Sequence, residues 1–549
     1  MKFEKLYQKL ERTFGSMKFA VVVIVLFTIG MIIGTFLESY YGTDFAGRVI
    51  YKSTPFMLLQ FFMFLSIICA AFIRLPIKKR LYGFYVIHTG LVIIGCGSFI
   101  TWYAGIDGTI SLDPNSPARH VFLQEDVFKI HYQDEGKQVT YKLPYTAFAT
   151  NINEQYKGIT LKEYVPFADR KLSWEKEKNK YKSEIRHSSS YFLYNENVSQ
   201  DFILSLHPEA QDFEATMSMG LMNIHYLPAP LAKCFPLESK SKLIVWDAKD
   251  RQCFTPEQKN IEIQKTDNDV RFFAFKNTAG RVISFFPDMS PWAFDEQIKP
   301  MKNAQYRVFS KKLFEDKAHL FLFGTKAAYF DKYLDTPGWV MQEFGSNKSI
   351  KLPWMDFTLE LVKHDDELVP VYLPEKTLPI QKSNQMIKGD LRALKINVRG
   401  TDYWVTSERP LRLLIDGKDT LFTVQKETLR LPFELVLTKF KMDKDPGTNN
   451  PASYESFVSL FTKDGPVKSH IYMNNPLKYA GFTFYQASYS QNPETGQYSS
   501  TLSVNVDQGR FLKYLGSLLL VLGATWHYMI TRRRVKLKNA KALFEAQQA

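Results

Sequence analysis

The chain has 549 residues, a mildly negative mean hydropathy and a formal net charge of +14. Its length allows about three or four domains, but the apolar residues gather in three runs near the start and one near the end, so the middle of the chain must be soluble. The absence of Cys-x-x-Cys, Gly-x-Ser-x-Gly, His-Glu-x-x-His and a glycine-rich phosphate loop argues against thioredoxin-like proteins, hydrolases, metalloproteases and kinases.

Four apolar runs without Lys, Arg, Asp or Glu are each long enough to cross a bilayer as a helix. Backbone amides cannot stay unpaired in lipid, so these runs must be helical. No small-x-small cleavage site follows the first run, so we expect an uncleaved anchor and not a signal peptide. The four runs are Phe19–Leu37, Phe56–Ile73, Leu81–Ile106 and Tyr514–Thr531.

Basic residues mark one side of these helices. The positive-inside rule then places both termini in the cytoplasm and residues from about Asp107 to Arg510 outside it. We interpret the basic tail as a topology signal and not as a nucleic-acid-binding segment. The basic residues are Lys2, Lys5, Lys9, Arg12 and Lys18 before the first helix, Arg74, Lys78, Lys79 and Arg80 between the second and third, and Arg532, Arg533, Arg534, Lys536 and Lys538 after the fourth. The link between the first two helices is not enriched in basic residues, since its Arg48 and Lys52 are matched by Glu38 and Asp44.

The long segment between the third and fourth helices alternates apolar and polar residues with a period of two, as at Phe433, Leu435 and Leu437. Such alternation, interrupted by turn signals, predicts antiparallel β structure with one buried face. Residues 482–490 and 499–506 resemble the two arms of one hairpin. The predicted fold class is therefore a polytopic membrane protein, with four transmembrane α-helices (three before and one after) and a large β-rich extracytoplasmic domain.

Three regions follow from this pattern: residues 1–106 with the N-terminus and three helices, residues 107–510 as the outer domain, and residues 511–549 with the fourth helix and basic tail. A join inside the outer domain is expected near Gly345 to Ser349. Residues 287–317 mix helix-forming residues, so one or two helices are expected there. Cys234 and Cys253 can form a disulfide if the domain lies in an oxidising compartment.

Two histidines lie within the apolar runs. An ionisable residue at membrane depth is costly and usually functional, so His88 in the third run has either a functional role or the role of a neutral histidine bonded to a neighbouring helix. His527 lies just before the arginine cluster, beside Trp526 and Tyr528, where it can instead serve as an interfacial anchor. Because the third and fourth helices run in opposite directions, both histidines are expected near the cytoplasmic leaflet.

Glycines share a face with each of these histidines, Gly95 with His88 and Gly523 with His527. Small residues let transmembrane helices approach closely, and neutral imidazole is a strong axial ligand for haem iron, so both histidines are candidate haem-binding residues. The other eight histidines lack the spacing of a metal site, and we interpret most of them as surface or structural residues. They are His120, His131, His187, His207, His225, His319, His364 and His470.

Several segments resemble the ResB family, also called CcsB, of the system II pathway of cytochrome c biogenesis. The resemblance covers roughly the first hundred and the last two hundred residues, and Asn475–Tyr489 is its most specific part. The segments are Glu38–Gly42 (ESYYG), Val49–Ser53 (VIYKS), His88–Gly95 (HTGLVIIG) and Asn475–Tyr489 (NPLKYAGFTFYQASY).

The resemblance implies a multi-pass protein of the bacterial inner membrane that works with a CcsA-type partner carrying a tryptophan-rich haem motif. Together the two proteins would carry haem b across the membrane and join it to apocytochrome c. His88 matches the intramembrane histidine of the family, which is an axial ligand of the haem iron. No tryptophan-rich motif occurs in this chain, and the haem role of His527 rests on its depth and on Gly523 alone.

Alternative functions stay open from the sequence alone. The chain can be a scaffold subunit of the same complex that binds no haem, or an unrelated membrane-anchored sensor or binding protein. The resemblance places it in a cytochrome c haem-lyase complex, but no residue of this chain stands out as a catalyst, so enzymatic activity is left undecided.

Overall fold

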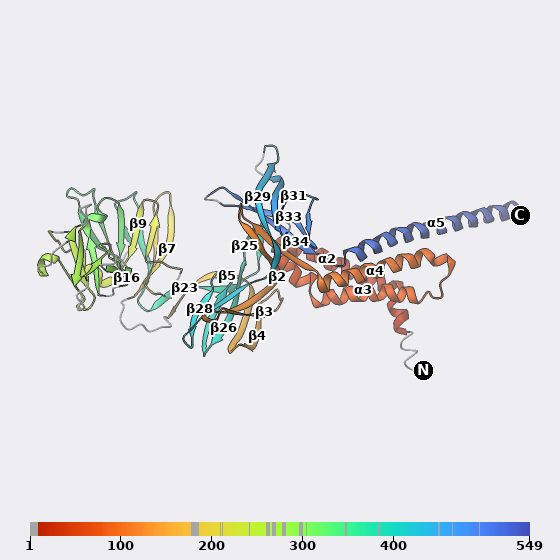
Figure 1. Ribbon diagram of the computed structural model, residues 1–549, viewed down its shortest axis with the longest axis horizontal. Helices are drawn as coiled ribbons and strands as arrows, with labels where there is room; N and C mark the ends of the chain where they lie inside the picture. The colour runs from red at the N-terminus through yellow and green to blue at the C-terminus, as the bar shows by residue number, and fades with distance from the viewer. Residues whose placement is uncertain are drawn as a thin grey trace. The chain divides into compact units, whose positions relative to one another are not determined.

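The computed structural model describes residues 9–548 except 177–185, 209, 211, 241, 260–263, 266–270, 277–281, 296–299, 303–304, 346–348, 383–384, 448–450, 464 and 493–494. Contacts divide the chain into two compact units (Figure 1). Unit 1 comprises Met1–Asp169 and Pro374–Ala549, and unit 2, Arg170–Leu373, is inserted between its two parts. The join expected near Gly345 to Ser349 falls largely on residues 346–348, which lie outside the described residues.

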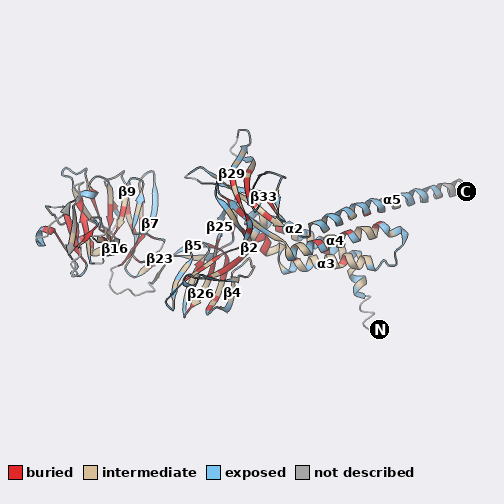
Figure 2. Cartoon of the chain, in the orientation of Figure 1, coloured by how far each residue is buried: buried red, intermediate tan, exposed pale blue. Residues whose placement is uncertain are grey.

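Four helices of unit 1 are long and apolar enough to cross a membrane, which confirms the predicted helical part of the fold. Only 11–17% of the residues in the apolar window of each helix are buried, so most residues of these windows are exposed or half-buried (Figure 2). These helices fit a multi-pass membrane protein, since lipid covers such a surface. They are α2 (Met17–Ala46), which continues as the π-helical turn η1 (Gly47–Tyr51), α3 (Thr54–Phe72), α4 (Tyr82–Ala104, after the 3₁₀ turn η2, Lys79–Leu81) and α5 (Arg510–Gln548).

A ten-stranded sheet forms the part of unit 1 that adjoins the helices. The paired arms β33 and β34 confirm the predicted hairpin. The strand order is β31 (Gly465–Ile471), β30 (Pro451–Thr462), β29 (Lys418–Lys444), β2 (Pro117–Tyr132), β1 (Ile106–Leu112), β34 (Tyr498–Val506), β33 (Phe482–Gln491) and β32 (Leu477–Tyr479), with β28 (Leu411–Ile415) beside β29 and β3 (Lys137–Lys142, after the 3₁₀ turn η3, Gln133–Glu135) beside β2.

A second sheet, most of which belongs to unit 1, shares a core with the first. Phe128 on β2 and Phe422 on β29 pack with Leu161 and Leu394 of the second sheet, while the far end of β29 supplies Phe433 to a separate core. The two long strands therefore connect both cores. The second sheet has the order β23 (Leu368–Lys376), β5 (Ile159–Lys176), β26 (Leu391–Val398) and β27 (Thr401–Thr406), with β4 (Thr150–Tyr156) beside β5, and a separate pair is formed by β24 (Ile380–Lys382) and β25 (Gln385–Lys388).

Strands lead directly into two of the helices. Only Gly105 separates α4 from β1, and β34 ends four residues before α5 begins. Because β1 and β34 are neighbours, with Ile106 opposite Val506, they bring α4 and α5 side by side. The two helices then approach through glycines, as a methyl group on Gly516 would lie 2.5 Å from the carbonyl oxygen of Gly90. This helix pair and the ten-stranded sheet form one continuous structure.

Unit 2 is also rich in β structure and contains four sheets among its described residues. All of its described ladders are antiparallel except the one between β9 and β18. The first two sheets have the orders β11 (Gln252–Phe254), β10 (Leu243–Asp247), β17 (Tyr306–Ser310), and β12 (Gln264–Lys265), β13 (Arg271–Lys276), β14 (Val282–Phe285), β15 (Trp292–Asp295), β16 (Pro300–Lys302). The third sheet has the order β20 (Gly338–Glu343), β19 (Lys326–Asp331), β18 (Ala318–Leu322), β9 (Met222–Tyr226), β8 (Thr216–Met219). The fourth sheet has the order β21 (Ser349–Lys351), β22 (Thr358–Asp365), β6 (Ser188–Tyr194), β7 (Ser199–Ser205).

The prediction of one or two helices over residues 287–317 is wrong. The described part of this stretch holds β15, β16, β17 and the 3₁₀ turn η6 (Lys311–Phe314). Its apolar residues complete cores: Val308 and Phe309 are fully buried on β17. Pairing of β17 with the buried strand β10 therefore overrides local helix propensity.

A disulfide joins Cys234 to Cys253, as the sequence allowed. Cys234 ends the 3₁₀ turn η4 (Ala229–Cys234), and Cys253 lies on β11, just before the 3₁₀ turn η5 (Pro256–Lys259). The bond fastens η4 to the edge of the sheet formed by β10, β11 and β17, since Cys253 is the register partner of Trp246 on β10.

Candidate functional site

His88 lies on α4 with its ring held by its own helix. Its Nδ1 is 2.9 Å from the carbonyl oxygen of Phe84, and its ring centroid is 3.8 Å from the ring of Phe84. A carbonyl oxygen can only accept, so this bond places the proton of the neutral imidazole on Nδ1 and the lone pair on Nε2. Histidines that bind metals are oriented in the same manner, by a hydrogen bond from the nitrogen that does not bind.

A cation lies over the Phe84 ring. The guanidinium of Arg74 is 4.5 Å from the ring centroid, and its Nη1 donates to the carbonyl oxygen of Ala70 at 2.8 Å. Arg74 and His88 therefore both contact the Phe84 ring near the start of α4. This shared contact puts positive charge from the basic link close to the half-buried imidazole.

His527 lies on α5 where that helix meets α4. A methyl group on Gly83 would lie 2.6 Å from the Cβ atom of His527, so the two helices touch at this point. The Nδ1 atom of His527 is buried and has no hydrogen-bond partner among the described residues. Most buried polar atoms have partners, so this nitrogen sets His527 apart from an ordinary packing residue.

The structure does not bring the two histidines onto one face. Residues 83, 87, 90 and 94 of α4 form the contact with α5, and His88 lies one position further, about 100° around the helix. The face that carries His88 also carries Gly95, which packs against Phe64 of α3. His88 therefore faces away from the α4–α5 seam, whereas His527 lies in it.

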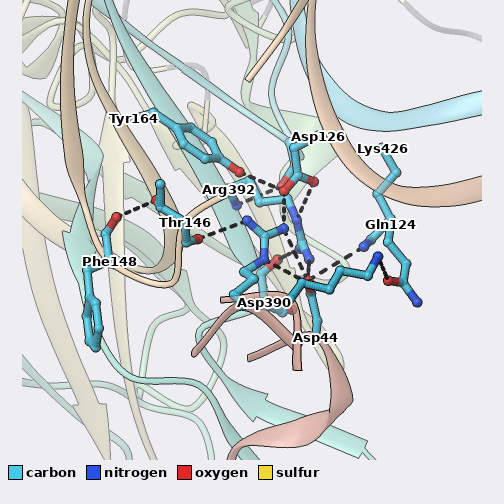
Figure 3. Close-up of polar contacts among 12 residues, drawn as sticks. Asp44, Gln124, Asp126, Thr146, Phe148, Tyr164, Asp390, Arg392 and Lys426 are labelled. Atoms are coloured by element: carbon cyan, nitrogen blue, oxygen red, sulfur yellow. Dashed lines mark hydrogen bonds and ion pairs between the residues drawn. The ribbon is translucent and has the colours of Figure 1, made fainter. Parts of the chain in front are cut away.

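A buried group of charges lies where α2 ends against the β structure of unit 1 (Figure 3). We call Asp44, Arg48, Asp126 and Arg392 the α2 ion cluster. Arg48 pairs with Asp44 at 2.9 Å and with Asp126, and Arg392 pairs with both carboxylates at 2.9 Å. Two carboxylates and two guanidiniums thus close a ring, and the side chains of Arg48 and Asp126 have 0% and 1% exposure.

Further side chains complete the bonding of the ring. Tyr164 on β5 donates to Asp126 at 2.7 Å, and Arg48 donates to the carbonyl oxygen of Thr146 at 3.0 Å. Burial, together with the Asp126 carboxylate, raises the pKa of Tyr164 well above its usual value, so this hydroxyl stays protonated and donates. Lys426 approaches Asp44 at 3.6 Å; burial lowers the pKa of this lysine, and the carboxylate of Asp44 opposes that shift.

The α2 ion cluster fixes the end of the first membrane helix to two sheets. Asp44 and Arg48 come from α2 and the π-helical turn η1, while Asp126 comes from β2 and Arg392 from β26. Single π-helical turns are frequent at functional positions in helices. The cluster can therefore hold the helix in one orientation against the β structure, or transmit a movement between them.

Sequence reasoning missed this cluster. Its only local signal is the i, i+4 spacing of Asp44 and Arg48, which also occurs on ordinary exposed helices. Asp126 and Arg392 lie in strands that are far from α2 in the sequence, and only the fold brings these side chains to the end of α2. Burial of Arg48 is unexpected because arginine is almost never fully buried unless paired.

Several histidines of unit 2 are structural, as interpreted from the sequence. His187 is fully buried, with Nε2 3.2 Å from the carbonyl oxygen of Leu227 and Nδ1 bonded to the hydroxyl of Tyr226. Burial, reinforced by neighbouring His364, lowers the pKa of His187 to about 3. His225 is 3.0 Å from His319, and burial lowers the pKa of His225 to about 4. Over the described residues, no group of three or more His, Cys, Asp or Glu side chains is arranged to hold a metal ion.

Comparison with known proteins bears out the family resemblance. Residues 414–502 match the sequence model of the ResB-like family. A stretch of 151 residues is 32% identical to Protein NrfI of Wolinella succinogenes, which covers 27% of this chain and 16% of that relative. The chain thus aligns with about a sixth of that protein's length. The family match covers β29, β30, β31, β32 and β33 and most of β34, so it falls on the sheet that continues into α5.

Proposed function

We propose that this chain is a membrane subunit of a complex that matures c-type cytochromes. In that complex it helps to hold haem b within the membrane and to present it to apocytochrome c outside the cytoplasm. The observation that carries the proposal is the match of residues 414–502 to the ResB-like family. The matched strands lead into α5, which packs on the His88-bearing helix α4, so the family-specific sheet and the candidate haem ligand belong to one unit.

His88 is the proposed axial ligand of the haem iron. Its support is the bond from Nδ1 to Phe84, which leaves the Nε2 lone pair for coordination. Arg74, next to the Phe84 ring, adds a cation beside that position, and haem carries two carboxylates that a cation would stabilise. His527 is proposed as a second haem contact because its buried Nδ1 has no partner among the described residues.

A second membrane protein is part of the proposal. A CcsA-type partner with a tryptophan-rich haem motif would supply the opposite ligand and the presentation surface. The outward-facing apolar residues of the four helices leave room for such contacts within the bilayer. The Cys234–Cys253 disulfide supports a position of unit 2 outside the cytoplasm, because disulfides persist in oxidising compartments.

The alternative is a scaffold subunit that binds no haem. The same hydrogen bond between His88 and Phe84 also fits this alternative, since a histidine that only packs in a helix can likewise donate one ring N–H to a carbonyl oxygen of its own helix. In that case the α2 ion cluster and the sheet would position the partner, and His88 would fill space. The two functions differ in whether haem is lost when His88 is changed.

An optical spectrum of the chain, purified alone and with its partner, tests the proposal. We expect a haem b spectrum in the complex, and His88→Ala should reduce haem content about tenfold or more, since even an outer-shell partner of a metal ligand is worth about 10–100-fold. Cytochrome c maturation should fall in parallel. His120→Ala, at an exposed histidine of the β structure, is the matched control and should change neither quantity.

Chemical rescue separates a ligand from a packing residue. Added imidazole should restore part of the haem spectrum in His88→Gly if the histidine coordinates iron. Unchanged haem content and maturation in His88→Ala would instead support the scaffold function. Retention of cytochrome c in cells that lack the chain would contradict both functions.

A further inference from the structure

Unit 2 contains a cavity of about 830 Å³, a size typical of small-molecule sites, which measure about 300–1,000 Å³. It lies where elements of several sheets meet, with walls from β8, β9, β10, β15 and β17 and from the 3₁₀ turn η4. Nothing in the proposed haem function uses this cavity, because His88 and His527 belong to unit 1.

The described lining of the cavity is rich in cationic side chains. Its described lining includes Arg186, Lys249, Arg251 and Arg307 but only one carboxylate, that of Asp288. Arg186 is 9% exposed, whereas Lys249 and Arg251 are exposed in the turn after β10. Cations set in a concave surface with low-dielectric walls focus their field and attract anions.

Aromatic side chains form the other part of the lining. Trp246 on β10 is 3% exposed, while Trp292 on β15 is 47% exposed and so offers one open ring. Arg307 lies opposite Trp246 in the ladder between β10 and β17, and its Nη1 donates to the carbonyl oxygen of Met289 at 3.3 Å. Guanidinium and indole groups are thus neighbours in the same wall.

The wall is held rigid from behind. Tyr226 also lines the cavity, and its hydroxyl bonds to His187 and, at 2.6 Å, to Ser189. The disulfide fastens η4, which supplies Leu231, to the partner strand of β10. A site whose side chains are fixed before binding loses less entropy when a ligand arrives.

We propose that this cavity binds a small aromatic molecule that carries at least two anionic groups. The cations recognise its carboxylates or sulfonates through charge-assisted hydrogen bonds, and the open ring of Trp292 packs on its aromatic ring. His225, which also lines the cavity, stays neutral near pH 7 and contributes no charge. The site does not depend on the proposed haem function.

Binding of 8-hydroxypyrene-1,3,6-trisulfonate to the full chain in nanodiscs of zwitterionic lipid tests the proposal. This aromatic polyanion is fluorescent and stays out of zwitterionic bilayers, so its anisotropy reports binding to the protein. We expect saturable binding that the double variant Lys249→Gln/Arg251→Gln weakens about tenfold or more, as expected for lost contacts to charged groups. Arg307→Gln and Trp292→Ala should also weaken binding.

Two comparisons distinguish this site from general attraction of anions. Lys351→Gln, at an exposed lysine of unit 2 outside the cavity, should leave the affinity unchanged. Benzene-1,3,5-tricarboxylate should displace the dye at a concentration about tenfold lower than citrate, which carries the same number of carboxylates without a ring. Because Lys249 and Arg251 are exposed, we expect their replacement to leave the fold intact.

Three results would each overturn the proposal. They are a loss of affinity in Lys351→Gln equal to that in Lys249→Gln/Arg251→Gln, an undiminished affinity of the Lys249→Gln/Arg251→Gln variant, and competition by citrate equal to that by benzene-1,3,5-tricarboxylate. Binding that does not saturate would also overturn it. None of these outcomes affects the haem proposal, since the dye contains no metal and the variants lie in unit 2.

Discussion

Asp126 shows how one residue can control the position of a helix. Its carboxylate is 1% exposed and accepts from Arg48, Arg392 and Tyr164, which come from different elements. Charges buried in this way are tolerated because each has its counter-charge, and the loss of one partner leaves the others uncompensated. The side chain therefore stabilises the junction of α2 with the β structure.

Replacing Asp126 with Asn should destabilise unit 1 by about 3–5 kcal/mol, because two guanidiniums would stay buried with one carboxylate between them. Thermal unfolding of the purified chain, followed by circular dichroism, measures this effect. Asp402→Asn is the control, since Asp402 pairs with Lys162 on the partly exposed surface of the same unit and should cost only about 0–1 kcal/mol. Equal effects of the two variants would show that the α2 ion cluster contributes no more than a surface ion pair.

At the scale of elements, the decisive feature is the continuity of two strands with two helices. The register of β1 against β34 determines where α4 and α5 leave the sheet. Hydrogen bonds reinforce this exit, as Thr101 donates to Asp507 at 2.6 Å and Lys513 pairs with Asp507 at 2.7 Å. A movement of the sheet would therefore reach the helix that carries His88.

Gly516→Leu should separate α4 from α5, because even the Cβ atom would lie 2.5 Å from the carbonyl oxygen of Gly90. Leucine is a better helix former than glycine by less than about 1 kcal/mol, whereas overpacking costs typically about 1–3 kcal/mol, so the clash should prevail. Ser517→Leu adds similar bulk at the neighbouring exposed position and should be neutral. Thermal stability in detergent measures both, and a stable Gly516→Leu variant would mean that the helices need no close contact.

On the scale of the whole molecule, the chain combines two units with different chemistry. Unit 1 joins the apolar helices to the sheet that matches the ResB-like family model. Unit 2 begins within β5 and ends within β23, and it has its own cores, disulfide and cavity. Unit 2 also contains His187 and His225, which burial keeps neutral near pH 7. They make its stability depend on pH.

Acid should selectively destabilise unit 2. The pKa of His187 is lowered to about 3 and that of His225 to about 4 in the folded state, so between these values and about 6.5 the unfolded chain binds protons that the folded chain does not. Stability therefore falls as the pH falls below about 6.5, by about 2 kcal/mol per histidine at pH 5 relative to pH 7. Urea unfolding followed by tryptophan fluorescence at both pH values measures the loss. In the variant His187→Gln/His225→Gln, the stability of unit 2 should depend much less on pH. An unchanged loss of stability between pH 7 and pH 5 would show that other groups cause it.

Much of the fold could be predicted from local sequence. The four helices follow from uncharged runs of sufficient length, and the hairpin of β33 and β34 follows from period-two alternation on both sides of a turn. Helices over residues 287–317 were predicted wrongly, because the partners of β17 lie elsewhere in the chain and local propensity cannot report them. His88 could be proposed as a candidate from sequence because an ionisable residue inside an apolar run stands out without any partner.

The sequence by itself determined which segments enter the membrane, which alternate as strands, and that His88 lies within a membrane helix. These properties depend on hydropathy and spacing within about 20 residues. Only the tertiary structure decided that Asp44 and Arg48 meet Asp126 and Arg392, that His88 and His527 lie on different faces, and that four cations surround one cavity in unit 2. Each of these depends on contacts between residues far apart in the chain, and such contacts leave no periodic signal in the sequence.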